Sequence, residues 1–161
     1  MKFTLQVPLY PSGHGYSCYF LVPDEAAEQM KTAFGSRRTI CHLPNGHYFH
    51  CALMPRKAGG HTINVSKALL DKGQLEPHET YTLVFEKDES EYQMEVPEEW
   101  MEVLGIDPEA KEIFDGLTKG KQRSIMHLVG SAKQIDTRIN RALKIAENLK
   151  LGARTPKEFL R

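Results

Sequence analysis

The strongest signals of the fold lie between Arg37 and Phe85, in the sequence RRTICHLPNGHYFHCALMPRKAGGHTINVSKALLDKGQLEPHETYTLVF. Its pattern predicts a hairpin, a glycine-containing loop, a strand, one short helix, a turn and a closing strand. The dipeptide Asn45-Gly46 is the strongest hairpin signal, because a type I′ turn needs positive φ at both central residues. This order of elements is typical of a small closed β-barrel, and it contains none of the common catalytic motifs.

The register of this hairpin raises the question of a metal site. A two-residue loop would place Cys41 opposite His50 on one face, roughly 5 Å apart, with His42, His47 and Cys51 on the other face. A metal-dependent enzyme using Cys41 and His50 is therefore one alternative. The spacing matches no zinc pattern, so the simpler interpretation is buried thiols on one face and surface histidines on the other. We predict neither a metal nor a cofactor.

The segments before this stretch complete the barrel unit. Residues 3–9 alternate between apolar and polar side chains, which predicts a strand. Residues 10–16 contain one proline and two glycines and predict a turn, and residues 17–22 predict a second strand. Asp24 is placed to cap a helix that Gly35 ends.

After a predicted strand YQMEV at residues 92–96, the apolar period becomes helical. Helices are predicted over 97–104, after the caps Asp107, Thr118 and Asp136, and at the Thr155 capping box. The last long helix is expected to turn one set of side chains inward: Ile139, Ala142, Leu143, Ala146 and Leu149.

The general class follows from size, cysteines and charge. A chain of 161 residues with three cysteines and no signal-peptide pattern is expected to be cytoplasmic, with reduced thiols. No apolar run is long enough to span a membrane. The net charge is zero, but residues 86–107 carry nine acidic side chains and one lysine, whereas residues 108–161 carry twelve basic and six acidic ones.

The basic loop PRKAGGH is the leading candidate for a ligand site. Glycines free backbone N–H groups and the basic side chains add positive charge, which suits an anion. The alternative is a solvated loop that joins two strands. The predicted ligand-binding residues are Arg56, Lys57, Gly59, Gly60 and His61.

A second candidate surface lies on the last long helix. At 100° per residue, Arg138, Arg141 and Lys144 fall on one arc, away from the apolar stripe. The arc could hold nucleic acid or an acidic partner. The interpretation that we favour is that it offsets the acidic segment at residues 86–107.

Residues 1–87 resemble the bacterial and archaeal family called domain of unknown function 1905. The resemblance rests on TAFG at residues 32–35, LPNGHYFHCALMP at 43–55, KAGGHTINVSKALLDKG at 57–73 and LEPHETYTLVF at 75–85. It implies a double-split β-barrel, similar in architecture to the AbrB-like regulators. The usual Gly-Asp of the family's turn is His78-Glu79 in this chain. Because residues 1–22 supply an extra strand pair, we expect a monomeric barrel, with a dimer as the alternative.

Residues 94–152 resemble the YdeI or OmpD-associated "bacteriocin-protection" domain, through VPEEWMEVLGIDPEAKEIFDGLTKGKQRS and AKQIDTRINRALKIAENLKLG. The family's usual aromatic pair is replaced by Met126-His127-Leu128. We therefore predict an α+β protein with a double-split β-barrel at 1–87, a helical domain at 94–152 and a tail at 153–161. The resemblance implies a phenotype, protection against stress, and no established reaction.

These observations lead to one functional hypothesis with two alternatives. The chain is expected to be a non-enzymatic binding or stress-protection module that holds a small anionic molecule or peptide in a groove between barrel and helix. A nucleic-acid-binding regulator is the alternative by fold analogy, although the near-neutral barrel argues against it. The metal-dependent enzyme using Cys41 and His50 is the other.

Overall fold

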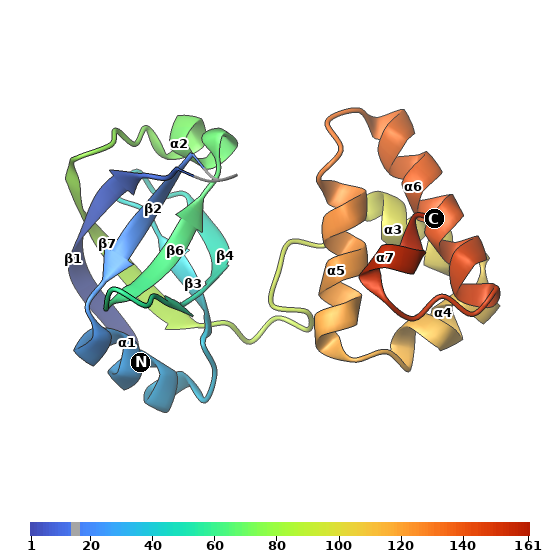
Figure 1. The fold of residues 1–161 in the computed structure, drawn as a ribbon, viewed down its shortest axis with the longest axis horizontal. Helices are drawn as coiled ribbons and strands as arrows, with labels where there is room; N and C mark the ends of the chain where they lie inside the picture. Colours follow the sequence, from blue (N-terminus) through green and yellow to red (C-terminus); the bar gives the residue numbers. More distant parts are fainter. Residues whose placement is uncertain (14–16) are drawn as a thin grey trace. The chain divides into compact units, whose positions relative to one another are not determined.

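The computed structural model describes residues 1–13 and 17–161. The chain divides into two compact units, Met1–Gln93 and Met94–Arg161. The first is the β-rich unit drawn from blue to green in Figure 1, and the second is helical and drawn from yellow to red. The turn predicted at residues 10–16 includes residues 14–16, which lie outside the described residues.

The first unit is a nearly closed antiparallel barrel that follows the order β4-β3-β7-β1-β2-β6-β5. Its described residues form seven strands: β1 (Lys2–Pro11), β2 (Cys18–Val22), β3 (Arg38–His42), β4 (Tyr48–Ala52), β5 (Met54–Pro55), β6 (His61–Val65) and β7 (Thr80–Lys87). The two edge strands, β4 and β5, are consecutive in the chain and only Leu53 separates them, so one bent segment joins both edges of the sheet. This barrel, followed by helices, confirms the predicted α+β class.

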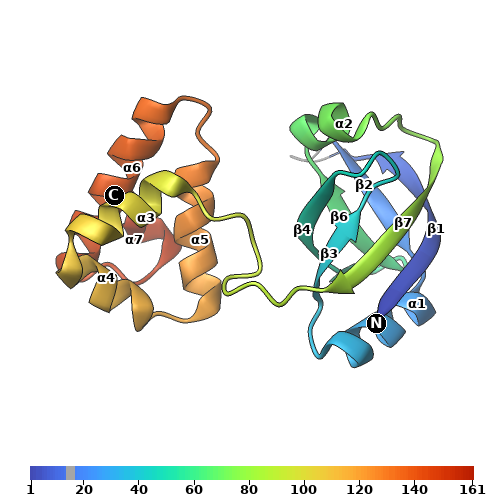
Figure 2. The same ribbon diagram turned by 180° about the vertical axis from the view of Figure 1, so that it is seen from behind.

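The barrel interior follows from the alternation in the strands. Successive side chains of a strand point to opposite faces, and the inward set is apolar and fully buried, as in Leu9, Phe20, Ile63 and Phe85. Two helices, α1 (Asp24–Phe34) and α2 (Lys67–Gly73), lie at the two ends of the barrel in both views (Figures 1 and 2). They cover the apolar interior where the strands end.

Local sequence signals account for the end of α1 and the start of α2, but the predicted cap Asp24 is the first residue of α1 and makes no capping hydrogen bond. Helix α1 buries Ala27, Met30 and Phe34 and ends at Gly35, whose φ of 67° is the left-handed conformation that glycine adopts easily. Helix α2 begins after Ser66, whose Oγ accepts a hydrogen bond from the Leu69 N–H.

The predicted hairpin exists, but its predicted register is wrong by one residue. His42 pairs with Tyr48, and Cys41 pairs with Phe49 instead of His50. The Gly46 N–H donates to the Leu43 carbonyl at 3.0 Å. The loop therefore has three residues, of which only Gly46 has positive φ, at 91°. A one-residue change of register turns every side chain of a strand to the other face.

The second unit consists of five helices within the described residues. They are α3 (Glu98–Ile106), α4 (Pro108–Asp115), α5 (Lys119–Gly130), α6 (Ile135–Lys150) and α7 (Pro156–Phe159). The predicted caps Asp107 and Thr118 accept backbone hydrogen bonds at the starts of α4 and α5, and the capping box at Thr155 is present. Trp100 and Phe114 meet edge to face in the core, with ring centroids 5.3 Å apart.

Two details of this region differ from the prediction. Residues 92–96 form no strand: residues 91–94 are bends, and residues 95–97 have no regular structure. On α6, Ala142, Ala146 and Leu149 are buried as predicted, but Ile139 and Leu143 are exposed. Ile145 takes an inward place, so the buried stripe is rotated relative to the predicted one. No helix of the described residues is long and apolar enough to cross a membrane.

Candidate functional site

The basic loop is a tight turn between β5 and β6. The Arg56 N–H donates to the Gly60 carbonyl at 3.1 Å, and the Gly59 N–H donates to the Arg56 carbonyl at 3.0 Å. Gly59 and Gly60 have φ values of 94° and 78°. A Cβ on Gly60 would lie 2.8 Å from the Leu21 side chain. Backbone conformation therefore favours glycine at both positions, and space favours it at Gly60, independently of any ligand.

The predicted binding groups of this loop are turned towards the protein itself. The Arg56 guanidinium donates to the Gly59 carbonyl at 3.0 Å and to the Tyr19 hydroxyl at 3.5 Å. The Gly60 N–H donates to the carboxylate of Asp24, at the start of α1, and this bond is the main reason why the pKa of Asp24 is below its ordinary value. Lys57 is exposed. The loop thus already holds one carboxylate, which comes from the same chain.

His61 is the most enclosed member of the predicted site, with 4% of its surface exposed. Its Nδ1 lies 2.9 Å from Asp24 Oδ1, an ion-pair distance without the direction of a hydrogen bond. Its Nε2 lies 3.4 Å from Lys31 Nζ and 3.7 Å from Glu28 Oε1. Both ring nitrogens therefore face charged groups of α1, and we call His61, Asp24, Glu28 and Lys31 the α1 histidine cluster.

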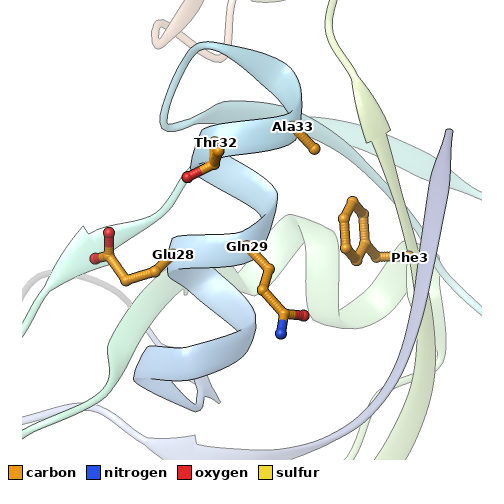
Figure 3. A pocket seen from close by; sticks show the side chains of 5 residues that line it. All are labelled: Phe3, Glu28, Gln29, Thr32 and Ala33. Carbon is orange, nitrogen blue, oxygen red and sulfur yellow. The ribbon is translucent and has the colours of Figure 1, made fainter.

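A shallow depression of about 480 Å³ lies across α1 beside this cluster. Figure 3 shows Phe3 and Ala33 on one side of the helix, and Glu28 and Thr32 on the other. The polar ends of these side chains do not converge on a common point. The depression itself therefore specifies no ligand, and Glu28 is the residue that it shares with the α1 histidine cluster.

Two of the three basic side chains predicted as a binding surface on α6, Arg138 and Arg141, make contacts within the protein. Arg138 donates to the Ala132 carbonyl at 2.6 Å and lies 3.6 Å from Glu99. Arg141 donates to the Leu128 carbonyl at 2.9 Å. Both arginines thus bond to carbonyls at or just beyond the C-terminal end of α5, where positive charge is favourable. Lys144 is exposed, and its predicted role in binding a partner stays a prediction.

Sequence reasoning missed a second cluster, on the outer face of β3, β4 and β7. His50 Nδ1 lies 2.6 Å from Asp88 Oδ2, and the Ser90 N–H and hydroxyl donate to Asp88 Oδ1 at 3.0 and 2.5 Å. Burial by itself raises the pKa of Asp88, but the hydrogen bonds from His50 and Ser90 outweigh it and leave the pKa below its ordinary value. The carboxylate is therefore charged although it is buried.

The same face carries a second histidine–carboxylate pair. His42 Nε2 lies 3.0 Å from Glu86 Oε1, and this bond is the main cause of the lowered pKa of Glu86. The Tyr48 ring neighbours both histidines, with centroids 5.7 Å from His42 and 6.4 Å from His50. We call these five residues, His42, Tyr48, His50, Glu86 and Asp88, the outer histidine face. Glu86 and Asp88 are 44 and 38 residues away from their histidine partners, so no local sequence motif predicts these two pairs.

The cysteines lie inside the barrel, away from these histidines. Cys41 is fully buried, and burial strongly raises its pKa. Burial also raises the pKa of Cys51 to about 12. Because Cys41 faces Phe49 inside and His50 faces outward opposite Ile40, the predicted Cys41–His50 pair is wrong. No group of three or more metal-ligating side chains occurs within residues 1–13 and 17–161. The alternative of a metal-dependent enzyme at Cys41 and His50 thereby loses its geometric basis.

Comparison with protein families supports one of the two resemblances. The resemblance of residues 1–87 to the domain of unknown function 1905 is not confirmed and stays a prediction. No curated protein and no solved structure matches the chain. Residues 93–152, which hold most of the helical unit, match the family described as "Bacteriocin-protection, YdeI or OmpD-Associated".

Proposed function

We propose that this chain is a non-enzymatic binding module associated with bacteriocin protection, and that the loop Arg56–His61 binds the carboxylate of an acidic peptide or a small anionic molecule. The family match of residues 93–152 supports the first part. The second part rests on one observation, the convergence of the loop on the carboxylate of Asp24. A donor set that already holds an internal carboxylate has the geometry to hold an external one.

The internal carboxylate can be displaced. The Asp24 side chain is 60% exposed. Its rotation away from the loop into water therefore changes its hydration only a little. Lys57 lies exposed beside the same turn and would add a positive charge to an incoming anion. The Arg56 guanidinium donates two of its N–H groups to Gly59 and Tyr19, and its other N–H groups can donate to a ligand. In this proposal Asp24 acts as a built-in competitor of the ligand.

A substitution at Asp24 tests this directly. Asp24→Asn keeps the size of the side chain and removes its charge, so it should bind acetate and a hexaglutamate peptide about tenfold more tightly than the wild type, as measured by isothermal titration calorimetry. Adding Arg56→Ala and Lys57→Ala to this variant should abolish the gain. The matched control is Glu25→Gln, which removes an equal charge from the next, exposed residue of α1.

Two results would overturn the proposal. One is a folded Asp24→Asn protein that binds neither probe at millimolar concentration. The other is an equal gain in the Glu25→Gln control, which would show that only the net charge matters.

A further inference from the structure

The outer histidine face has a chemistry opposite to that of the basic loop. In an antiparallel pair, directly opposite residues project to the same side. His42 pairs with Tyr48, while Ile40 pairs with both His50 and Glu86. The two histidines, the tyrosine and the Glu86 carboxylate therefore occupy one surface of the sheet. Asp88 joins them from the end of β7 through its bond to His50.

The carboxylates determine which nitrogen of each histidine carries a proton. An ionised carboxylate only accepts hydrogen bonds. His50 must therefore donate through Nδ1 to Asp88, and His42 through Nε2 to Glu86. In the neutral rings this leaves His50 Nε2 and His42 Nδ1 as acceptors. Within the described residues, no hydrogen bond to either of these two nitrogens occurs.

Tyr48 adds an exposed aromatic ring next to both histidines. The residue is 61% exposed, although it is a large aromatic side chain on a strand. Its neighbours His42 and His50 are partly exposed, with 32% and 19% of their side chains accessible. An aromatic face next to carboxylates attracts a cation through the ring quadrupole and the nearby negative charge.

We propose that the outer histidine face binds a lysine or arginine side chain of a basic peptide. The cation lies against the Tyr48 ring and donates hydrogen bonds to His50 Nε2 and His42 Nδ1. The site is independent of the basic loop and of the anion that we propose there.

The charges around this face favour a cation over an anion. The segment at residues 86–93 contains four acidic side chains and one lysine, and Glu89 and Glu91 are exposed within it. Two basic side chains also lie at this face. Lys2 is 3.4 Å from Glu86, and the Arg38 guanidinium donates to the Gln93 carbonyl. Both side chains are therefore directed to acceptors of the protein itself. Lys2 and Arg38 neutralise part of the acidic surface, but Tyr48 stays exposed.

Nuclear magnetic resonance of the full chain tests the proposal. The probe is a trilysine peptide with blocked ends, and its matched control is the same peptide with all three lysines acetylated. We expect the trilysine peptide to shift the ring signals of His42, Tyr48 and His50 and to leave those of His47 unchanged. His47 is an exposed histidine of the same hairpin and serves as the internal reference.

Variants identify the residues responsible. Tyr48→Leu removes the aromatic ring from an exposed position and should weaken trilysine binding at least fivefold without unfolding the barrel. His47→Gln should have no effect, and neither should the pair Arg56→Ala and Lys57→Ala, which separates this site from the anion site.

The proposal is overturned if trilysine at millimolar concentration leaves the His50 and Tyr48 signals in place. It is equally overturned if the acetylated peptide binds as well, or if a triglutamate peptide binds to this face in place of trilysine.

Discussion

His61 and His50 both meet an aspartate through Nδ1, at 2.9 and 2.6 Å, yet the two sites are built in opposite ways. In the α1 histidine cluster the imidazole is buried and its carboxylates are exposed. In the outer histidine face the carboxylate of Asp88 is fully buried and the imidazole reaches the surface. The buried partner is the one that cannot return to water when the pair is broken. Two histidine–aspartate contacts of similar length can therefore differ in energy, and they leave different groups exposed to a ligand.

Matched substitutions of the two histidines should give the largest contrast. His50→Leu leaves the buried charge of Asp88 without one of its partners and should lower the free energy of unfolding by about 3 kcal/mol. His61→Leu puts an apolar side chain at a buried position, while Asp24 and Glu28 regain water, so its effect should stay within about 1 kcal/mol. Urea unfolding of both variants measures the difference. Equal losses would show that burial of the carboxylate is not what distinguishes the sites.

The pH dependence of stability should show the same contrast more weakly. The pKa of Asp88 is lowered by folding. Its contribution is therefore present above the unfolded-state pKa of about 3.9 and is lost as the pH falls through the lower folded-state value. The stability difference between the wild type and Asp88→Asn should shrink as the pH is lowered below about 4.

Asp24 gives the control for this measurement. Its pKa is also lowered, but its side chain is mostly exposed. Asp24→Asn should therefore change the pH dependence of the free energy of unfolding below about pH 4 less than Asp88→Asn does. A larger change in the Asp24 variant would reverse our ranking of the two sites.

The smallest effects are expected at two lysines, Lys31 of the α1 histidine cluster and Lys2 beside the outer histidine face. Lys31 lies 2.6 Å from Glu28, and Lys2 lies 3.4 Å from Glu86. Both are surface ion pairs, so Lys31→Met and Lys2→Met should each change the free energy of unfolding by no more than about 0.5 kcal/mol, and less at high salt. Thermal unfolding at two salt concentrations measures this. A loss above 1 kcal/mol at either lysine would mean that its cluster depends on the cation as well as on the histidine.

Much of the fold could be predicted because its signals are local. The alternation at residues 3–9, the caps Ser66 and Thr118, and the glycine at position 35 each act within a few residues of themselves. The hairpin register could not be predicted from Asn45-Gly46 alone. Pro44 was the neglected signal, because its fixed φ suits the second position of a turn that begins at Leu43 and leaves only Gly46 in the left-handed region.

The candidate sites were less predictable, because their partners come from distant parts of the chain. The loop Arg56–His61 was identified from its composition, but composition did not show that Asp24 already meets Gly60 and His61. His78 has a φ of 70° in the turn before β7. Glycine adopts that conformation without the steric penalty that other residues meet.

The amino-acid sequence was enough to predict the class of this protein, most of the order of its strands and helices, and the resemblance of residues 94–152 to a known family. Periodicity, caps and turn residues are short-range properties, so they can be read along the chain. Which carboxylate meets which histidine follows only from the folded structure, because those pairs depend on register and on strands brought together from distant positions. On the outer face of the sheet, Asp88 is buried beneath its partners, and His50 and Tyr48 stay accessible to a ligand.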